Sequence, residues 1–349
     1  MHAALATVAE RTWTGRGTGE RALRAALVPA AMAYAVVTRL RNRLYDARWL
    51  TVTRVPARVV SVGNITVGGT GKTPAALWLA EALRARGWHP AIIARGYRKR
   101  RRGVVVVGEG KGPVVSAEDG GDEAVLLARR FAGPVVTGER RADAAAVACA
   151  RFGVDIVVLD DGFQHRALAR DADLVLATED ATTAWPLPAG PLREPPAALA
   201  RARAILAVDG APPPAGAVPV FRGRLLPTAL VGTDGGEQPL GTLAGRDVTA
   251  VAGIARSERF LATLHGLGAR VRDVLRYPDH HAYDAHDVAR IAAALATGPV
   301  VTTEKDLVKL GRWASLAAVT AVRVALEVER GDALVDVLAG SPEVDLRRD

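Results

Sequence analysis

The sequence predicts an α/β protein with a doubly wound, mostly parallel sheet, a second and smaller α/β domain, and an N-terminal amphipathic helix. Strand-like and helix-like segments alternate from residue 58 to about 225, and again from 248 to 338. The strand-like segments are apolar throughout, as expected for parallel strands that are covered on both faces. The chain has 349 residues, of which 49% are apolar and 24% charged, and this length favours two domains.

The first 58 residues carry most of the net charge of +9, because they hold ten arginines against three acidic residues. They include an uncharged apolar stretch, residues 25–37, which Pro29 interrupts and several arginines follow. This stretch is too short to span a bilayer, which takes about 20 residues. An apolar helix flanked by arginines can lie among anionic headgroups. The alternative is a core helix with a solvated arginine face.

A glycine-rich loop follows the first predicted strand, residues 58–62, and precedes a predicted helix over residues 72–86. Residues 63–74 read Gly-Asn-Ile-Thr-Val-Gly-Gly-Thr-Gly-Lys-Thr-Pro. Backbone N–H groups of such a loop bind phosphate oxygens, and the helix N-terminus adds partial positive charge. Lys72 is then expected to reach the β- and γ-phosphates and the Thr73 hydroxyl to hold Mg²⁺. The loop predicts binding of ATP with Mg²⁺.

The loop departs from the usual phosphate-binding pattern at one position, where Thr66 stands in place of glycine. The additional glycines at 68 and 69 supply flexibility instead. A glycine-rich turn without a ligand is the alternative, but the strand before the loop and the helix after it favour the nucleotide. The predicted nucleotide-binding residues are Thr66, Val67, Gly68, Gly69, Thr70, Gly71, Lys72 and Thr73.

The remaining elements follow from the same periodicities. A Pro/Gly-rich segment, residues 211–216, marks a loop, and the domain boundary is placed near residues 215–245. The first set has predicted strands at 90–94, 104–107, 134–136, 155–159, 173–177 and 204–208, with helices at 122–131 and 140–152. The second set has strands at 248–252, 269–276, 299–302 and 320–326, with helices at 257–267, 284–296 and 332–338.

Two features narrow the class of protein. The single cysteine, Cys149, excludes an intramolecular disulfide and favours a reducing compartment. A basic run at residues 98–102 has no interleaved aromatic residues, and no nucleic-acid-binding module is recognisable. The sequence therefore predicts no nucleic-acid partner.

Two further segments carry candidate catalytic residues. The apolar strand at 155–159 ends in Asp160 and Asp161, and acids at the carboxyl end of a strand beside a phosphate-binding loop hold Mg²⁺. The stiff loop at residues 187–195 presents Arg193 and Glu194 together. It is either a plain rigid turn or a device that fixes Arg193 near the transferred phosphoryl group and Glu194 near the metal.

Asp122 and His280 are the remaining candidates. Asp122 opens a predicted helix, where an N-cap role is the alternative. His280 lies in an Asp-His-His run, residues 279–281, without companion ligands at zinc spacing. A general-base role therefore fits His280 better than a metal site. Because the predicted domain boundary places His280 in the second domain, it is expected to act across an interdomain cleft.

These motifs together resemble the tetraacyldisaccharide 4′-kinase (lipid A 4′-kinase) family, from about Leu27 to Leu326. In that family Thr at position 66 is usual, and the motif that contains Arg140-Arg141 leaves open which arginine contacts the substrate. The motifs in order are GNITVGGTGKTP (63–74), RGY (95–97), GDE (121–123), Arg140-Arg141, LDDGFQHR (159–166), LPAGPLREP (187–195), DHH (279–281) and TTEKD (302–306).

The resemblance implies transfer of the ATP γ-phosphate to the 4′-hydroxyl of tetraacyldisaccharide 1-phosphate, a lipid A precursor. It implies an Asp–His base, which here is Asp122 with His280. The implied catalytic residues are Asp122, His280, Lys72 and Arg193; the metal ligands Thr73, Asp160, Asp161 and Glu194; and the substrate contacts Asn64, Arg95, Arg141, Gln164 and His165.

The resemblance also divides the chain into a membrane-associated helical segment (1–50), a P-loop kinase domain (51–225) and a smaller C-terminal α/β domain that closes the cleft (226–349). It places the protein on the cytoplasmic face of the inner membrane of a Gram-negative-type bacterium. The expected partners are the anionic glycolipid and an anionic membrane surface, with no obligate protein partner.

Two other classes of protein share parts of this pattern. A soluble small-molecule kinase with a P-loop is disfavoured by the arginine-flanked apolar N-terminus. A membrane-bound switch or partitioning ATPase often carries Lys before the Gly-Gly pair, where this chain has Val67. The guanine-reading Asn-Lys-x-Asp pattern is also absent from the sequence.

Overall fold

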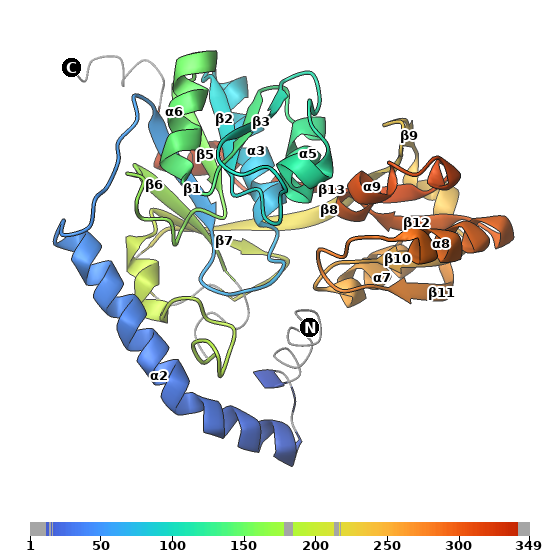
Figure 1. Ribbon diagram of the computed structural model, residues 1–349, viewed down its shortest axis with the longest axis horizontal. Helices are drawn as coiled ribbons and strands as arrows, with labels where there is room; N and C mark the ends of the chain where they lie inside the picture. Colours follow the sequence, from blue (N-terminus) through green and yellow to red (C-terminus); the bar gives the residue numbers. More distant parts are fainter. Residues whose placement is uncertain are drawn as a thin grey trace. The chain divides into compact units, whose positions relative to one another are not determined.

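The computed structural model describes residues 12–13, 15, 17–177, 184–212, 216 and 218–340. The chain forms two compact units, each built from non-contiguous segments. Unit 1 comprises residues 1–95, 138–224 and 328–349, and unit 2 comprises residues 96–137 and 225–327. The fold is mixed α/β with mostly parallel strands, as predicted (Figure 1).

Unit 1 is organised around a parallel sheet in the order β8-β7-β6-β1-β5-β2. Helices α3, α6 and α10 pack against its strands. The strands are β1 (Arg58–Gly63), β2 (Pro90–Ala94), β5 (Ile156–Asp160), β6 (Ala172–Ala177), β7 (Ala204–Val208) and β8 (Val220–Gly232), and the helices are α3 (Lys72–Ala85), α6 (Arg141–Phe152), α10 (Gly331–Leu338) and the short 3-10 helix η1 (Pro196–Arg201).

The register of this sheet places the phosphate-binding loop beside the predicted acids. β1 lies between β5 and β6, and Val62 pairs with Asp160. The carboxyl ends of β1 and β5 therefore lie side by side at the point where the strand order changes direction, which is where ligands bind in open α/β sheets.

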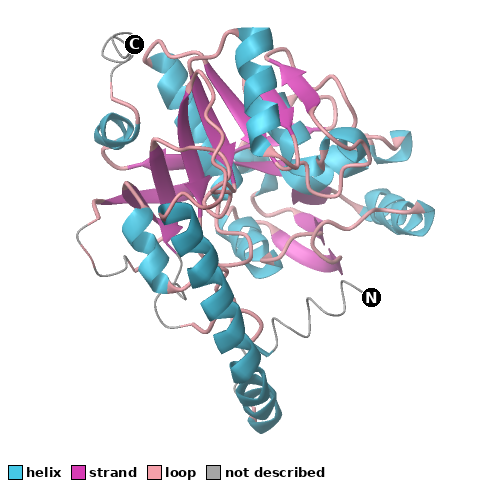
Figure 2. Ribbon diagram, turned by 60° about the vertical axis from the view of Figure 1, so that its left-hand side comes forward, coloured by secondary structure: helices cyan, strands magenta, loops and turns pink. Residues whose placement is uncertain are grey.

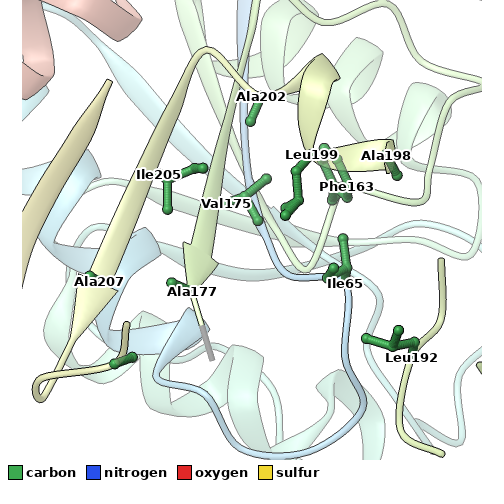
Figure 3. Close-up of a cluster of buried hydrophobic side chains, with 11 residues drawn as sticks. Ile65, Phe163, Val175, Ala177, Leu192, Ala198, Leu199, Ala202, Ile205 and Ala207 are labelled. Carbon is green, nitrogen blue, oxygen red and sulfur yellow. The ribbon is translucent and has the colours of Figure 1, made fainter. Parts of the chain in front are cut away.

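A buried hydrophobic cluster anchors the loops that leave these strands (Figure 3). Ile65, Phe163 and Leu192 come from three different loops, and all are almost completely buried against Val175 and Ile205. Burying each such side chain contributes roughly 1.5–3 kcal/mol, so the cluster fixes the three loops relative to the sheet.

Close packing also explains the glycine that ends β1. A Cβ at Gly63 would lie 2.6 Å from Cβ of Phe163 and 2.9 Å from its backbone nitrogen. Any side chain at position 63 would therefore push apart the two loops that follow β1 and β5.

Among the described residues near the N-terminus, the main element is the long helix α2 (Thr18–Asp46) (Figures 1 and 2). Ala31, Ala35 and Thr38 are buried. The helix contains an 18-residue window with a mean hydropathy of 1.3, of which only 11% is buried, so its length and composition would allow a membrane span. The apolar stretch predicted from the sequence was too short to span a bilayer, but the helix that contains it is longer than that stretch. The exposed large apolar side chains of α2 are Leu23, Met32, Val36, Val37 and Leu40.

Of the predicted N-terminal segment 1–50, residues 1–11, 14 and 16 lie outside the described residues. The rest of that segment is dominated by α2, so the predicted amphipathic helix is confirmed.

Unit 2 contains a parallel group of strands in the order β11-β10-β12-β13 and an antiparallel pair, β3 with β4. The short strand β9 (Glu237–Gln238) pairs antiparallel with the distal part of β8. The strands are β3 (Val105–Glu109), β4 (Pro134–Thr137), β10 (Asp247–Ala252), β11 (Arg270–Arg276), β12 (Val300–Thr303) and β13 (Thr320–Val328), and the helices are α4 (Ala117–Gly120), α5 (Asp122–Arg130), α7 (Ser257–Gly266), α8 (Ala285–Thr297), α9 (Glu304–Leu310), η2 (Leu240–Leu243) and η3 (Ala314–Leu316).

The two units do not follow the predicted division of the chain in sequence order. Residues 96–137 belong with residues 225–327, because α5 packs on α9. β8 runs through the predicted boundary as a 13-residue strand. The burial pattern of β8 is irregular. Its sequence includes Arg, Gly and Pro, so it lacks the apolar run from which a strand is predicted. α10, expected in the C-terminal domain, belongs to unit 1.

Candidate active site

The phosphate-binding loop leads from β1 into α3, as the sequence predicts. Gly71 is the N-cap residue of α3 and has a φ of 86°, a left-handed conformation that favours glycine. Pro74 lies in the first turn, where a missing N–H costs no helix hydrogen bond. The amino end of α3 therefore follows directly on the loop 68–71, in the arrangement that binds phosphate.

The start of this loop is held by the loop at residues 187–195. Thr66 forms a β-bridge with Leu192. The Val67 N–H donates to the Pro191 carbonyl over 2.8 Å, and the Arg193 N–H donates to the Ile65 carbonyl over 2.7 Å. Thr66 is thus extended and paired, a conformation that does not need the glycine of the usual pattern.

The two acids at the end of β5 have different partners. The Thr73 hydroxyl donates to Asp160 Oδ2 over 3.2 Å. Lys72 Nζ lies 3.8 Å from Asp161 Oδ1 and 3.4 Å from the Gly68 carbonyl. Desolvation acts to raise the pKa of Asp161, but Lys72 and Arg193 outweigh it and hold that pKa below its ordinary value. Asp161 is therefore ionised at neutral pH.

Arg193 connects the loops around the nucleotide site. Its guanidinium binds both oxygens of Asp161 at 3.0 Å and donates to the Thr66 carbonyl at 2.9 Å and to Asn64 Oδ1 at 2.6 Å. Asn64 in turn donates to the hydroxyls of Thr66 and Thr70. Asn64 is fully buried and its amide makes these contacts, so it holds the loops together, and its role as a substrate contact stays a prediction.

Glu194, expected among the metal ligands, has side-chain partners within unit 1. Its carboxylate is only 1% exposed and accepts hydrogen bonds from Arg201 and from Asn42 of α2. The ion pair with Arg201 compensates the buried charge. Thr73 and Asp160 lie together, whereas Glu194 faces α2 and ties that helix to the loop of Arg193.

Further contacts bind α2 to the loops of the site. Tyr34 donates its hydroxyl to the Arg193 carbonyl over 3.0 Å, and Arg41 donates to the Gln164 carbonyl over 2.7 Å. Gln164 itself donates its side-chain amide to the Asn64 carbonyl over 2.8 Å. The side chain of Gln164 is therefore engaged within unit 1.

A cationic group lies beside the two acids. Arg141 is 7% exposed, and burial, together with the neighbouring Arg95, lowers its pKa. Its Nε has no hydrogen-bond partner among the described residues. Burial and the surrounding arginines lower the pKa of His165 to about 4, so His165 is neutral at pH 7. Arg140 is exposed and pairs with Asp143, so of these two neighbouring arginines only Arg141 belongs to the cationic group.

Unit 2 brings Asp122 and His280 together, although 158 positions separate them. Asp122 Oδ2 lies 3.1 Å from His280 Nδ1, and Asp122 Oδ1 accepts the Glu123 N–H. Desolvation acts to raise the pKa of Asp122, but the hydrogen bond from His280 and the charge of Lys305 outweigh it and lower that pKa to about 2. Asp122 is thus the first residue of α5 and an ionised partner of the imidazole, not a helix cap.

Sequence reasoning missed Lys305, which contacts the same imidazole. Its Nζ lies 3.1 Å from His280 Nε2, and it also donates to Glu123 and Asp279. The only sequence signal was its place in the Thr-Thr-Glu-Lys-Asp run. No periodicity marked the segment 304–310 as the helix α9 that carries it.

The oxygen donors beside the phosphate-binding loop suit a small hard cation. Thr73 and Asp160 supply a hydroxyl and a carboxylate, which Mg²⁺ accepts alongside phosphate and water oxygens. Among the described residues, no group of three or more His, Cys, Asp or Glu side chains is arranged to hold a metal by itself. A metal here would depend on the bound nucleotide for its remaining ligands.

A phosphate-binding loop after a central parallel strand, with acids at the end of the neighbouring strand, defines a P-loop nucleotide-binding protein. The model of the LpxK family, tetraacyldisaccharide-1-P 4′-kinase, matches residues 23–341. The chain belongs to this family, and it is an ATP-binding kinase of lipid A biosynthesis.

Similar proteins cover most of the chain. A tetraacyldisaccharide 4′-kinase of Anaeromyxobacter dehalogenans (strain 2CP-C) is 43% identical over 90% of each chain. One of Syntrophus aciditrophicus (strain SB) is 42% identical over 82% of this chain and 84% of its own. The crystal structure of LpxK from Aquifex aeolicus in complex with ATP has a TM-score of 0.79 and 31% identity, covering 90% of this chain and 98% of its own.

Proposed function

We propose that this chain transfers the γ-phosphoryl group of ATP to the 4′-hydroxyl of tetraacyldisaccharide 1-phosphate, giving the bis-phosphorylated lipid A precursor. The observation that carries the proposal is the paired arrangement of Lys72, Asp161 and Arg193 beside the phosphate-binding loop, in a chain of the tetraacyldisaccharide 4′-kinase family. Phosphoryl transfer depends mainly on positioning and charge stabilisation, and these residues supply both.

On the nucleotide side, residues 66–73 hold the phosphates and Lys72 neutralises charge on the β- and γ-oxygens. Asp161 holds the guanidinium of Arg193 at two points, so the arginine is fixed before the nucleotide arrives. Thr73 and Asp160 would hold Mg²⁺, which would supply charge neutralisation at the phosphates when bound.

On the acceptor side, Asp122 and His280 act as the base. A sugar hydroxyl is a poor nucleophile, and a positioned carboxylate–imidazole pair removes its proton as the attack proceeds. The O–H bond breaks and its proton goes to His280 Nε2. A new O–P bond forms as the bond between the γ-phosphorus and the bridging oxygen of ADP breaks, and ADP leaves. Asp122 stays ionised and stabilises the imidazolium.

The cationic group of unit 1 fits an anionic acceptor. Arg95 and Arg141 stand beside neutral His165, and a phosphate of the substrate would compensate their mutual repulsion. Gln164 belongs to the same loop as His165, and through its amide it orients that loop.

The membrane contact is proposed to be the exposed face of α2. Its packed face is hydrogen-bonded to the loops of Arg193 and Gln164, so the helix cannot leave unit 1 without loosening the site. The opposite face exposes Met32, Val36 and Leu40 at helical spacing. An interfacial helix on the cytoplasmic face of the inner membrane gives the enzyme access to a substrate that stays in the bilayer, and this face disfavours a soluble-substrate kinase.

Transfer is tested with the purified full-length protein, γ-labelled ATP, Mg²⁺ and tetraacyldisaccharide 1-phosphate in detergent micelles. We expect label in the extracted lipid, dependent on the enzyme. Label found only in released inorganic phosphate would contradict the proposal and would favour an ATPase.

The role of α2 gives a separate expectation. Replacing Met32, Val36, Val37 and Leu40 together with Ser removes four of the five exposed large apolar side chains of α2, so binding to anionic vesicles should weaken about tenfold or more. Transfer in detergent micelles should persist, because the packed face is untouched. Vesicle co-sedimentation and the micelle assay measure the two effects.

The matched control for this experiment replaces Val114 and Leu226, exposed apolar residues outside α2, with Ser. This control should bind vesicles like the wild type. If the α2 variant also binds like the wild type, the membrane contact lies elsewhere on the protein.

A further inference from the structure

The lysine of the Thr-Thr-Glu-Lys-Asp run has no part in the proposed transfer, yet it touches the proposed base. The Lys305 side chain is only 16% exposed. Its Nζ lies 3.1 Å from each of three acceptors: Glu123 Oε1, Asp279 Oδ1 and His280 Nε2. An ammonium group has three N–H donors and no acceptor, so these contacts use the whole group.

We propose that Lys305 is the positioning residue of the base: it holds His280 in the neutral tautomer that carries its proton on Nδ1, and so keeps Nε2 as the atom that accepts the proton of the acceptor hydroxyl. This inference rests on the proposed role of Asp122 and His280 in the transfer.

The tautomer follows from the donors and acceptors around the ring. Neutral imidazole has one N–H and one lone pair. Lys305 can only donate, so Nε2 must present the lone pair, and the proton must then be on Nδ1, where Asp122 accepts it. An imidazolium would instead set an N–H against the N–H of the ammonium. The low pKa of Asp122 agrees with this arrangement, because a carboxylate is the acceptor that the Nδ1 proton needs.

The neighbouring acids explain how Nε2 becomes available. When the hydroxyl takes the place of Lys305 at Nε2, the ammonium keeps Glu123 and Asp279 as partners. These carboxylates also lie 4.0 and 3.8 Å from Nε2, close enough to stabilise the imidazolium that forms. The lysine therefore sets the resting state of the base without receiving the proton itself.

Other groups that face the imidazole come from the loop after β2. The Tyr97 ring lies 4.8 Å from the imidazole, centroid to centroid, and Arg98 donates to the backbone carbonyl of His280 over 3.2 Å. The charged and titratable groups around the ring are Asp122 and Glu123 of α5, Asp279, Lys305 of α9, and Tyr97 and Arg98.

The decisive variant is Lys305→Met, which keeps the length of the side chain and removes its charge and donors. In protein labelled with ¹⁵N-histidine, wild-type His280 should show a protonated Nδ1 and an unprotonated Nε2 near pH 7. The variant should show exchange toward the other tautomer.

The rate of lipid phosphorylation in detergent micelles should reflect the altered tautomer of His280. We expect kcat to fall about 10- to 100-fold at pH 7, with the KM for ATP unchanged within about twofold.

Two controls separate positioning from a general loss of stability. Lys309→Met removes a similarly buried lysine of α9, which pairs with Asp306 at 2.8 Å and does not touch His280. It should lower the melting temperature but leave the ¹⁵N signals and kcat near wild type. Lys305→Arg keeps a positive donor, so it should retain the Nδ1–H tautomer and recover most of the rate. If Lys305→Met does not fold, Lys305→Gln, which keeps a neutral amide donor, takes its place.

The outcomes separate this inference from the proposed function. Wild-type ¹⁵N signals and kcat in Lys305→Met, beside an inactive His280→Ala, would overturn the role of Lys305 and leave the base in place. Wild-type rates in both variants would remove the base, and Lys305 would then be a structural ion pair.

Discussion

Replacing His280 or Asp122 with Ala should lower kcat for lipid phosphorylation by roughly 10²- to 10⁴-fold, the range that one general base contributes. The loss corresponds to about 3–5 kcal/mol in the barrier. Each change removes half of the pair that joins His280 Nδ1 to Asp122 Oδ2 at 3.1 Å. The combined variant should be scarcely slower than either single one, because the two side chains act as a unit.

The binding of ATP should survive these changes, because both residues lie in unit 2 and the phosphate-binding loop lies in unit 1. Titration with a fluorescent ATP analogue measures this binding, and lipid labelling under saturating substrate measures kcat. A wild-type turnover number in either variant would remove the pair from the mechanism.

The chain offers a matched control for this experiment in the next residue. His281 Nε2 lies 2.7 Å from Asp287 Oδ2, so it also belongs to an Asp–His pair of unit 2. That pair lies at the start of α8, where Asp287 completes a capping box with Asp284. His281→Ala should therefore cost stability, of the order of 1 kcal/mol for a weakened cap, while kcat stays within a few-fold of wild type.

Lys72→Ala should reduce transfer to near the limit of detection, by roughly 10²- to 10³-fold or more. Lys72 is the first residue of α3, and its Nζ lies 3.8 Å from Asp161 Oδ1. Without it, the transferred phosphoryl oxygens should lose the positive charge that we propose Lys72 supplies as their own charge develops. ATP affinity should fall as well, because we propose that the same side chain binds the ground-state phosphates.

Single-turnover labelling with enzyme in excess separates the loss of chemistry from the loss of binding. Arg84→Ala serves as the control, since Arg84 lies near the other end of α3 in an exposed pair with Glu81. Such exposed pairs contribute little to stability, so this variant should transfer phosphate normally. Activity retained in Lys72→Ala at saturating ATP would contradict the assigned role of the loop.

The nucleotide half of the site was predictable because its determinants are local. A strand, a glycine-rich loop and a helix N-terminus are contiguous in residues 58–86, and each part follows from residue type and spacing. Asp160 and Asp161 lie at the carboxyl end of their strand, and parallel pairing of β1 with β5 brings them to the loop. Composition predicted an amphipathic helix at the N-terminus but left open whether its apolar side is exposed or packed in the core.

Asn64 and Glu194 have packing partners that sequence reasoning does not reach. Glu194 stands beside Arg193 in a stiff Pro/Gly-rich loop, and the family resemblance implies a substrate contact for Asn64, so a direct role in binding was expected of both. Their functions in the fold depend on partners far away in the chain: Asn64 joins Arg193, and Glu194 joins Asn42 of α2. A polar side chain in a loop can face a ligand or satisfy a buried neighbour, and only the packing of the loops decides between them.

By itself, the sequence determined the class of sheet, the phosphate-binding loop, the acids beside it and the amphipathic helix, because each is written in contiguous residues and simple periodicities. The tertiary structure alone decided that residues 96–137 fold with residues 225–327. That arrangement brings α5 against α9, and so places Asp122, His280 and Lys305 within hydrogen-bonding distance. The physical reason is that these contacts join segments far apart in the chain through side-chain packing, which leaves no periodic trace in the sequence.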